Sequence, residues 1–314
     1  MRVCLMIEGQ EGVTWQQWTA LAAACEEHGL EGLFRSDHYS AIVQPVAGSL
    51  DAWATLAALA VVTERIRIGT MVSPATFRHP SVLARLAVTV DHVSGGRLEV
   101  GMGAGWYERE HRENGFDFAD ARTRFERFAE QVEIVVRSWT EDDWSFAGEH
   151  YRLERQTALP RPVQLPYPPL TLGGTAKPRS AALAARWAAE YNTGFATPEQ
   201  CEQRKATLVA ACEAAGRDPA SLAFSLMTVC VVGEDSDSVR DRLTRVMGLR
   251  GDASPLDELL EVEQDAWLVG TVEQVAERLA VYRAAGIERV YLQHLDHADL
   301  DMVETIGRLL VPAL

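Results

Sequence analysis

The stretch Phe34-Arg35-Ser36-Asp37-His38 decides the fold prediction, because it follows a short apolar run without a break. We interpret 30–34 as a buried β-strand, so the charged residues and the imidazole of His38 stand where that strand ends. In parallel α/β proteins, ligands bind at the carboxyl ends of the strands. A histidine at such a position is suited to proton transfer. A polar loop before the next helix is the plainer interpretation of the same residues.

Strand-like runs alternate with helical periodicity along the whole chain. Several helices have a recognisable start, such as the capping-box spacing of Thr14 with Gln17 and of Thr271 with Gln274. Eight strands, each followed by at least one helix, indicate a single (β/α)8 TIM barrel domain over residues 1–314, and a doubly wound open sheet is the alternative. The expected strands are 3–7, 30–34, 66–72, 98–103, 169–172, 190–195, 224–232 and 289–295.

Two segments interrupt this alternation, one after the fourth strand and one after the seventh. Residues 140–168 look irregular and proline-rich, and residues 248–268 contain glycines followed by an acidic run. Strand–helix alternation resumes after each segment, so we interpret them as insertions in one barrel and not as linkers between domains. Loops of this length often shape or cover a binding site.

The composition restricts the class of protein and its partners. Hydrophobic residues make up 47% of the chain, and the formal net charge is −15. A well-buried core is expected. An acidic surface repels phosphate backbones and anionic lipids, so we expect no nucleic-acid or membrane partner. Five cysteines without a C-x-x-C pair are expected to be reduced core residues, and no signal peptide is apparent, which predicts a cytoplasmic protein.

A first glycine-rich turn follows the fourth expected strand. It reads Gly103-Ala104-Gly105 and is followed by Trp106. The dinucleotide-binding fingerprint requires a helix that starts within the glycine run, and here helical periodicity resumes only near Asp120. Positions with little or no side chain let the backbone approach a flat or phosphorylated ligand. Tight turning at the exit of a strand is the alternative.

A second glycine-rich turn follows the fifth expected strand. It reads Gly173-Gly174-Thr175, and Pro178 suits the first turn of the helix that follows. Backbone N–H groups and the dipole at a helix N-terminus favour a phosphate. The turn therefore predicts a phosphate site, with a plain strand–helix connection as the alternative.

Two more polar side chains stand at the ends of the strands on either side of the second expected strand. Glu8 closes the first strand, and Ser73 stands before Pro74 at the end of the third, where a following proline favours extended backbone. With Asp37 and His38 they would converge on one mouth of the barrel, although spacing alone does not establish this.

Metal binding has little support in the sequence. The one cluster that could ligate a metal is His294-Leu295-Asp296-His297, which follows the eighth expected strand. We interpret it as a polar loop before the last helix, and no metal is expected.

These motifs resemble the bacterial luciferase-like superfamily of flavin and deazaflavin enzymes. Within that superfamily, the chain is similar to the actinobacterial oxidoreductases that use the deazaflavin coenzyme F420. The resemblance covers nearly the whole chain, and the motifs occur in family order. The matching stretches are Ile7-Glu8-Gly9-Gln10, Phe34-Arg35-Ser36-Asp37-His38, 72–80, 94–98, 101–111 and Gly173-Gly174.

The resemblance implies a TIM barrel with the cofactor ring at the carboxyl ends of its strands. It implies ring contacts for Asp37 and His38, with His38 as proton donor or acceptor. Glu8, from its place at the end of the first strand, is a second candidate catalytic residue. It also implies a backbone bulge under the ring at Val72-Ser73, which in relatives often includes a non-proline cis peptide.

The resemblance also assigns the two glycine-rich turns. Gly103, Ala104 and Gly105 would line the ribityl side of the cofactor, and Trp106 is a further candidate cofactor-binding residue. Gly173, Gly174 and Thr175 would hold its phosphate.

The function implied by this resemblance is hydride transfer between ring carbon five of coenzyme F420 and a small organic substrate. Trp106 stands where the sugar-phosphate dehydrogenase branch has a glutamate, so a flatter or more apolar substrate is expected. Two alternatives stay open: an FMN-dependent monooxygenase that uses reduced flavin and O2, and a non-catalytic flavin-binding barrel. Relatives commonly form dimers, and a homodimer is compatible with this chain.

Overall fold

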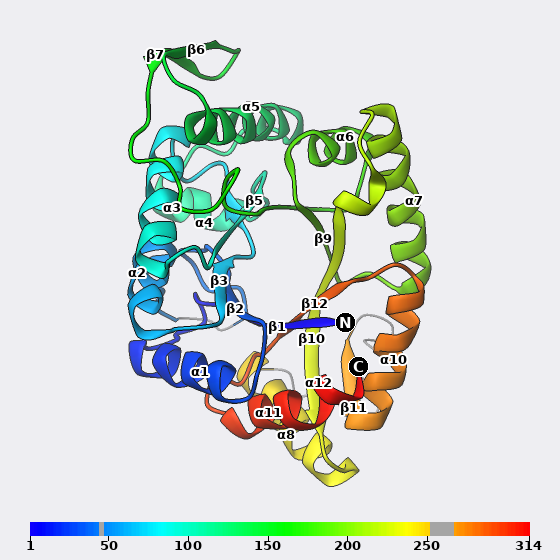
Figure 1. Cartoon of the computed structure of the whole chain (residues 1–314). Coiled ribbons are helices and arrows are strands. Elements are labelled where there is room, and N and C mark those ends of the chain that lie inside the picture. The colour runs from blue at the N-terminus through cyan, green and yellow to red at the C-terminus, as the bar shows by residue number, and fades with distance from the viewer. Residues whose placement is uncertain (44–46, 252–266) are drawn as a thin grey trace.

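The structure is a computed structural model that describes residues 1–43, 47–251 and 267–314. Its centre is a closed barrel of eight parallel strands (Figure 1). The barrel closes because the last strand pairs with the first, with Val3 beside Val290 and Leu5 beside Leu292. In order around the barrel, the strands are β1 (Arg2–Ile7), β2 (Gly32–Arg35), β3 (Arg67–Thr70), β5 (Leu98–Gly103), β8 (Leu170–Gly173), β9 (Glu190–Gly194), β10 (Ala223–Gly233) and β12 (Arg289–Gln293).

This closed barrel confirms the predicted (β/α)8 fold and excludes the open sheet. All eight strands lie within two residues of a predicted strand at each end, except that the third breaks after Thr70 and continues as the short β4 (Ser73–Pro74) beside β5. A further short strand, β11 (Leu268–Thr271), extends the sheet by pairing with the end of β10.

Helices surround the barrel (Figure 1). The predicted capping boxes of Thr14 with Gln17 and of Thr271 with Gln274 are both formed. The helices that follow them, α1 and α10, therefore start where the sequence indicates. The helices are α1 (Trp15–Glu27), α2 (Ala52–Val62), α3 (Pro80–Ser94), α5 (Ala121–Thr140), α6 (Pro178–Trp187), α7 (Pro198–Ala214), α8 (Ser236–Arg250), α10 (Val272–Ala284), α11 (Leu300–Thr305) and α12 (Val311–Ala313), with the short turns Pro219–Ser221 and Ile306–Leu310.

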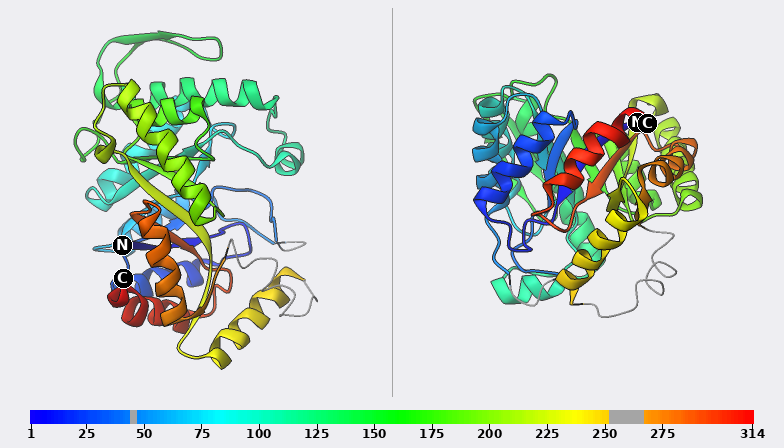
Figure 2. Two further views of the ribbon diagram at one scale, coloured as in Figure 1. Left: turned by 90° about the vertical axis from the view of Figure 1, so that its right-hand side faces the viewer. Right: turned by 90° about the horizontal axis from the view of Figure 1, so that it is seen from below.

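The helices bury apolar stripes against the outside of the barrel. In α1, Trp18, Leu21 and Cys25 are fully buried, and all five cysteines of the chain are buried and free. Burying one such side chain contributes roughly 1.5–3 kcal/mol. None of the described helices is both long and apolar enough to cross a bilayer. The two ends of the chain lie side by side in all views (Figures 1 and 2).

A charged layer closes the amino-terminal end of the barrel. The guanidinium of Arg289, 1% exposed, lies 2.6 Å from Glu99 and 3.2 Å from Glu190, and its Nε lies 3.1 Å from Glu31. Arg67 also pairs with Glu99. A buried charge is tolerated only when it is paired in this way.

An apolar layer fills the middle of the barrel above these charges. It consists of side chains from three strands, namely Cys4 and Met6 on β1, Phe34 on β2 and Tyr291 on β12, with Met71 directly after β3. Phe34 and Tyr291 meet edge to face with 4.9 Å between ring centroids. The open space of the barrel therefore lies at its carboxyl-terminal mouth.

The two predicted insertions have different outcomes. Residues 140–168 were expected to be irregular, but they contain an antiparallel hairpin of β6 (Trp144–Ala147) and β7 (Arg152–Gln156), which projects beyond α5 (Figure 1). Of the insertion 248–268, residues 252–266 lie outside the described residues. Its described ends belong to α8 and to β11.

A further correction concerns the segment after the first glycine-rich turn. Helical structure was expected to resume only near Asp120, but α4 (Glu108–Asn114) lies in between. Its first turn contains two glutamates, which favour a helix N-terminus, and Gly115 ends it in the left-handed conformation.

Candidate active site

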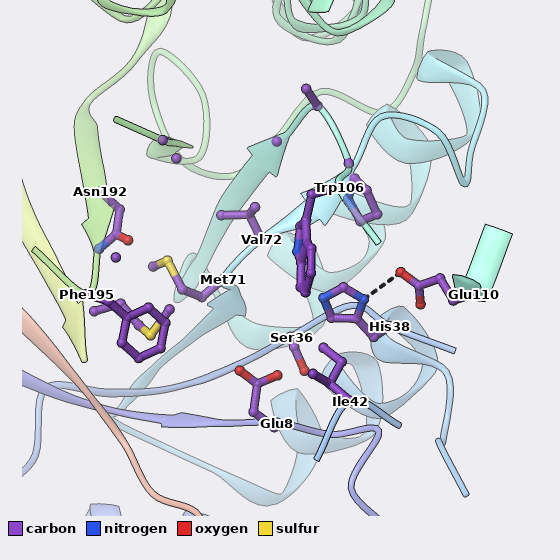
Figure 3. A pocket seen from close by; sticks show the side chains of 18 residues that line it. Glu8, Ser36, His38, Ile42, Met71, Val72, Trp106, Glu110, Asn192 and Phe195 are labelled. Carbon is purple, nitrogen blue, oxygen red and sulfur yellow. Dashed lines mark hydrogen bonds and ion pairs between the residues drawn. The ribbon is translucent and has the colours of Figure 1, made fainter. Parts of the chain in front are cut away.

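A cavity of about 560 Å3 opens at the carboxyl-terminal mouth of the barrel (Figure 3). Its walls come from the ends of β1, β2, β3, β5, β8 and β9, from the segments that follow them, and from Met227 in the middle of β10. This is where a parallel α/β barrel binds its ligands. The volume is in the range of small-molecule and cofactor sites.

His38 lies in the cavity wall, three residues beyond the end of β2. Its Nδ1 is 2.7 Å from Oε1 of Glu110, and Oε2 of Glu110 accepts the backbone N–H of Tyr39 at 3.0 Å. Glu110 is fully buried and comes from α4. The pair fixes the imidazole, with Nε2 on the side of the ring that faces away from Glu110 (Figure 3).

The surroundings of His38 favour its protonated form. Burial by itself lowers the pKa of a histidine, but here the hydrogen bond and the charge of Glu110, with the charges of Glu8 and Asp37, outweigh it. The pKa of His38 is therefore raised above its usual value of 6.5. In its protonated form the ring can act as a proton donor.

Glu8 presents a second carboxylate to the cavity from the end of β1. It accepts hydrogen bonds from the side-chain amides of Gln10, at 2.8 Å, and of Gln293. Gln10 is oriented in turn by the hydroxyl of Ser36, which donates to its Oε1 at 2.6 Å. Two amide donors hold the carboxylate of Glu8 without neutralising its charge.

Asp37 and Ser73 lie behind the cavity wall and are not among the residues that line it. The carboxylate of Asp37, 2% exposed, accepts from Ser73 Oγ at 2.6 Å and from Arg78 at 2.5 Å. Ser73 Oγ also accepts the indole N–H of Trp53 at 3.0 Å. These contacts brace the strand ends next to His38. The expected contacts of Asp37 and Ser73 with a cofactor stay predictions, and within the structure both side chains belong to this supporting network.

The end of β3 forms one side of the cavity. The peptide bond between Met71 and Val72 is cis, one residue before the Val72-Ser73 position that the family resemblance indicated. Met71 and Val72 both line the cavity. A Cβ placed on Gly103 would lie 2.8 Å from Cγ2 of Val72, so a side chain there would displace Val72 into the cavity. Gly103 therefore keeps this wall flat.

The second glycine-rich turn fits a phosphate only in part. Gly173 and Gly174 line the cavity, but Thr175 is exposed and does not. The backbone N–H of Gly174 donates to the carbonyl of Asn192, at 3.0 Å, and that of Ala176 donates to the hydroxyl of a tyrosine on β9. A phosphate at this turn would have the backbone N–H groups of Thr175 and Lys177 as donors.

Most of the predicted site residues line this one cavity, and their chemical roles stay predictions. Those that line it are Glu8, His38, Val72, Gly103, Ala104, Gly105, Trp106, Gly173 and Gly174.

The prediction missed several side chains in the cavity wall, notably Glu110 and Asn192. Asn192 lies in β9 two residues before its end, where a strand-end rule similar to that used for Glu8 could have found it. Nothing in the spacing of Glu110 indicated a contact with a histidine 72 positions away.

The His294-Asp296-His297 cluster lies outside the cavity wall. The carboxylate of Asp296 pairs with Arg245 at 2.9 Å. His294 is fully buried, and burial lowers its pKa to about 4; His297 is also buried, and burial lowers its pKa to about 4. Both rings are neutral at neutral pH.

Comparisons with known proteins identify the family. The luciferase-like monooxygenase family matches residues 3–289. A protein of Segniliparus rotundus named F420-dependent glucose-6-phosphate dehydrogenase is 26% identical over 323 residues, covering 93% of this chain and 91% of that protein. The FMNH2-dependent dimethylsulfone monooxygenase of Pseudomonas putida is 25% identical over 280 residues, covering 81% of this chain and 76% of that protein.

A solved structure gives the same result. The monooxygenase RslO1 from Streptomyces bottropensis has a TM-score of 0.84 and is 25% identical, with 100% of this chain and 98% of that chain covered. The family match and this likeness extend over the barrel and over the segments that form its mouth. The chain therefore belongs to the luciferase-like monooxygenase family of oxidoreductases.

Proposed function

We propose that this protein is a coenzyme F420-dependent oxidoreductase that transfers a hydride between the deazaflavin and a small organic substrate. The observation that carries the proposal is the His38–Glu110 pair, which places a ring of raised pKa in the wall of the mouth cavity. Relatives named as F420-dependent support it, including the Segniliparus rotundus enzyme and a Mycobacterium tuberculosis dehydrogenase that is 30% identical over 226 residues, covering 70% of this chain and 60% of that protein.

The cavity fits a flat tricyclic ring. Its lining includes glycines on three strand ends, namely Gly103 on β5, Gly173 on β8 and Gly194 on β9. Without side chains at these positions, backbone can lie against the face and edge of a planar ligand. Val72 would support the ring, and Gly173 and Gly174 would lie beside its phosphate-bearing chain.

The side chains of this protein would supply a proton and hold the reacting groups in place. When bound, the deazaflavin supplies the hydride chemistry at ring carbon five. His38 can give a proton to a substrate oxygen, or take one from it, because Glu110 holds the imidazole in place. Trp106 lies edge to face with His38 at 5.9 Å and is 63% exposed, so it covers one side of the imidazole only in part.

A reaction on a sugar phosphate is not proposed. The relative from Segniliparus rotundus is named for glucose-6-phosphate, but this chain has an indole, Trp106, beside the proton donor. An indole cannot take a proton from a sugar hydroxyl as a carboxylate can. We propose a more apolar substrate.

The second candidate is an FMN-dependent monooxygenase that uses reduced flavin and O2. The dimethylsulfone monooxygenase of Pseudomonas putida and the monooxygenase RslO1 are about as similar in sequence as the dehydrogenases. The glycine-lined wall accepts either tricyclic ring.

Equilibrium titration with the two cofactors tests the proposal. Purified protein is titrated with coenzyme F420 and with FMN, each oxidised and reduced, while absorbance and fluorescence are recorded. We expect tighter binding of the deazaflavin, followed by a change in its absorbance with a panel of ketones and secondary alcohols. Tighter binding of FMN with oxygen consumption would support the monooxygenase instead. Binding without any transfer would indicate a flavin-binding barrel.

A further inference from the structure

A second chamber of about 350 Å3 adjoins the mouth cavity. The two share four residues, namely Glu8, Ile42, Trp106 and Phe195. His38 lines the larger cavity but not this chamber, whereas Trp106, whose ring lies 5.9 Å from that of His38, lines both. A molecule in the second chamber would therefore lie beside the cofactor cavity, and His38 could reach it only across the shared residues.

The walls of this second chamber are mostly apolar. Val43, Val229, Trp267 and Leu295 line it in addition to the shared residues. Its size suits one or two fused rings, in addition to a cofactor in the larger cavity. Such walls favour a molecule with a hydrophobic ring.

The polar groups at one end of the second chamber are already hydrogen-bonded. The amides of Gln10 and Gln293 both donate to Glu8. Glu8 repels an anion, so this end suits an uncharged oxygen of a ligand. Glu8 and Trp106 also line the larger cavity, where His38 lies.

Arg250 supplies a positive charge in the wall of the second chamber. It is the last residue of α8, and its guanidinium lies over the ring of Trp267 at 4.9 Å. Elsewhere on α8, Arg242 and Arg245 both pair with Asp299, at 3.0 Å or less. Within the described ranges, Arg250 has no carboxylate partner.

We propose that the second chamber binds the organic substrate, and that this substrate is an apolar ring compound with an anionic group that pairs with Arg250. The inference rests on the proposed function, because it assigns the larger cavity to the cofactor. The ring of the substrate packs against Trp267 and Phe195, and its anionic group binds the guanidinium. The part that reacts then lies at the Glu8 end, beside the larger cavity where His38 lies.

Calorimetric binding of two matched probes tests this assignment. The probes are 2-naphthoate and its uncharged analogue 2-naphthamide, and the protein is the full chain without cofactor. We expect naphthoate to bind about tenfold more tightly than naphthamide, because a charge-assisted hydrogen bond to arginine is about twice as strong as a neutral one. Equal affinities would overturn the inference.

Two variants of α8 distinguish the effect of the charge on Arg250 from the effect of the net charge of the protein. Arg250→Met keeps most of the apolar stem and is expected to remove the preference for naphthoate. Arg240→Met removes one exposed positive charge from the same helix, away from the chamber, and is expected to leave the preference intact. Equal losses in both variants would contradict a specific role for Arg250.

A third variant locates the probe. Val229→Phe places a larger side chain in the wall of the second chamber, and it is expected to weaken binding of naphthoate at least fivefold while cofactor binding is retained. Its melting temperature is measured in parallel. Competition between naphthoate and the cofactor in the unaltered protein would show that the probe binds in the larger cavity. That result would overturn the inference.

The two proposals fail in different ways. If coenzyme F420 binds and naphthoate shows no preference over naphthamide, the substrate assignment fails and the proposed function stands. If naphthoate binds through Arg250 but neither F420 nor FMN binds, the proposed function fails.

Discussion

The single residue on which the proposed chemistry depends is His38, and its properties are set by a partner from a distant part of the chain. Glu110 contributes a charge and an oriented oxygen to the imidazole. This arrangement raises the pKa of a ring that burial alone would lower. Protonation of His38 and the geometry of α4 are thereby linked.

Replacement of Glu110 should change the titration of His38. Glu110→Gln keeps an oxygen that can accept the hydrogen bond but removes the charge, so the pKa of His38 is expected to fall. The pKa is measured from the imidazole NMR signals across a pH series. An unchanged pKa would show that Glu110 acts only through packing.

The raised pKa of His38 also makes the free energy of unfolding depend on pH in a defined direction. Since the folded pKa of His38 is raised, the His38–Glu110 pair stabilises the fold fully at pH below the unfolded value of about 6.5. This contribution is lost as the pH rises through the folded pKa. Urea denaturation of the protein and of Glu110→Gln should therefore differ more at pH 5.5 than at pH 9.

Removal of the imidazole should affect turnover and not cofactor binding. His38→Ala is expected to bind the cofactor as the unaltered protein does, while turnover falls by about 10²–10⁴-fold, the usual effect of a lost general acid. The exposed His92 on α3 provides a control, and His92→Ala should leave turnover unchanged. Unchanged turnover in His38→Ala would remove the residue from the mechanism.

Among the elements, strand β5 and the turn that follows it have the strongest influence on the cavity. The sequence predicted this strand at its observed bounds, because apolar residues end there in a glycine run. It did not predict α4, since seven mostly charged residues show no apolar stripe. The glutamates of its first turn and Gly115 were the available signals.

The flat wall formed by β5 can be tested at Gly103. In Gly103→Ala the new methyl group would meet Val72 at 2.8 Å and push it toward the ring position. Crowding of this kind costs about 1–3 kcal/mol, so cofactor affinity is expected to fall about tenfold or more. The affinity is measured by fluorescence titration with coenzyme F420 and with FMN.

A glycine on a helix, away from this wall, provides the control for the Gly103→Ala experiment. Gly248 lies in α8, and a Cβ there would meet no atom within 4 Å. Gly248→Ala is expected to leave cofactor affinity unchanged and to stabilise the helix slightly. If both substitutions weaken binding equally, the wall at Gly103 is not the cause.

For the whole molecule, hydrophobic periodicity predicted the positions of the eight strands and of most helices, because each follows a local pattern, whereas the closure of the barrel over an open sheet depends on the pairing of β1 with β12. The mouth was only partly predictable. Strand ends identified Glu8 and His38, whereas the support of Asp37 by Arg78 and Ser73 depends on side-chain directions across three segments. Local sequence does not specify such directions, so the same rule placed Asp37 in the cavity wall when it lies behind it.

The buried histidines near the end of the barrel should make the fold sensitive to acid. The folded pKa of His294 is about 4, below its usual value of 6.5, so the unfolded chain binds the additional proton between these values. Stability is therefore expected to fall by about 1.4 kcal/mol per pH unit for this residue as the pH decreases from about 6.5 to about 4.

Urea denaturation at a series of pH values measures this loss. His294→Gln cannot be protonated, and its stability should decline less steeply on the acid side than that of the unaltered protein. Parallel curves for the two proteins would show that His294 does not contribute.

The charged layer around Arg289 has one more consequence, which concerns the traffic of ligands. Among the described residues, paired charges and aromatic rings close the floor of the barrel. We therefore expect a bound molecule to enter and leave on the carboxyl-terminal side, where the two adjoining cavities share four residues. The residence time of a molecule in one cavity should then depend on whether the other cavity is filled.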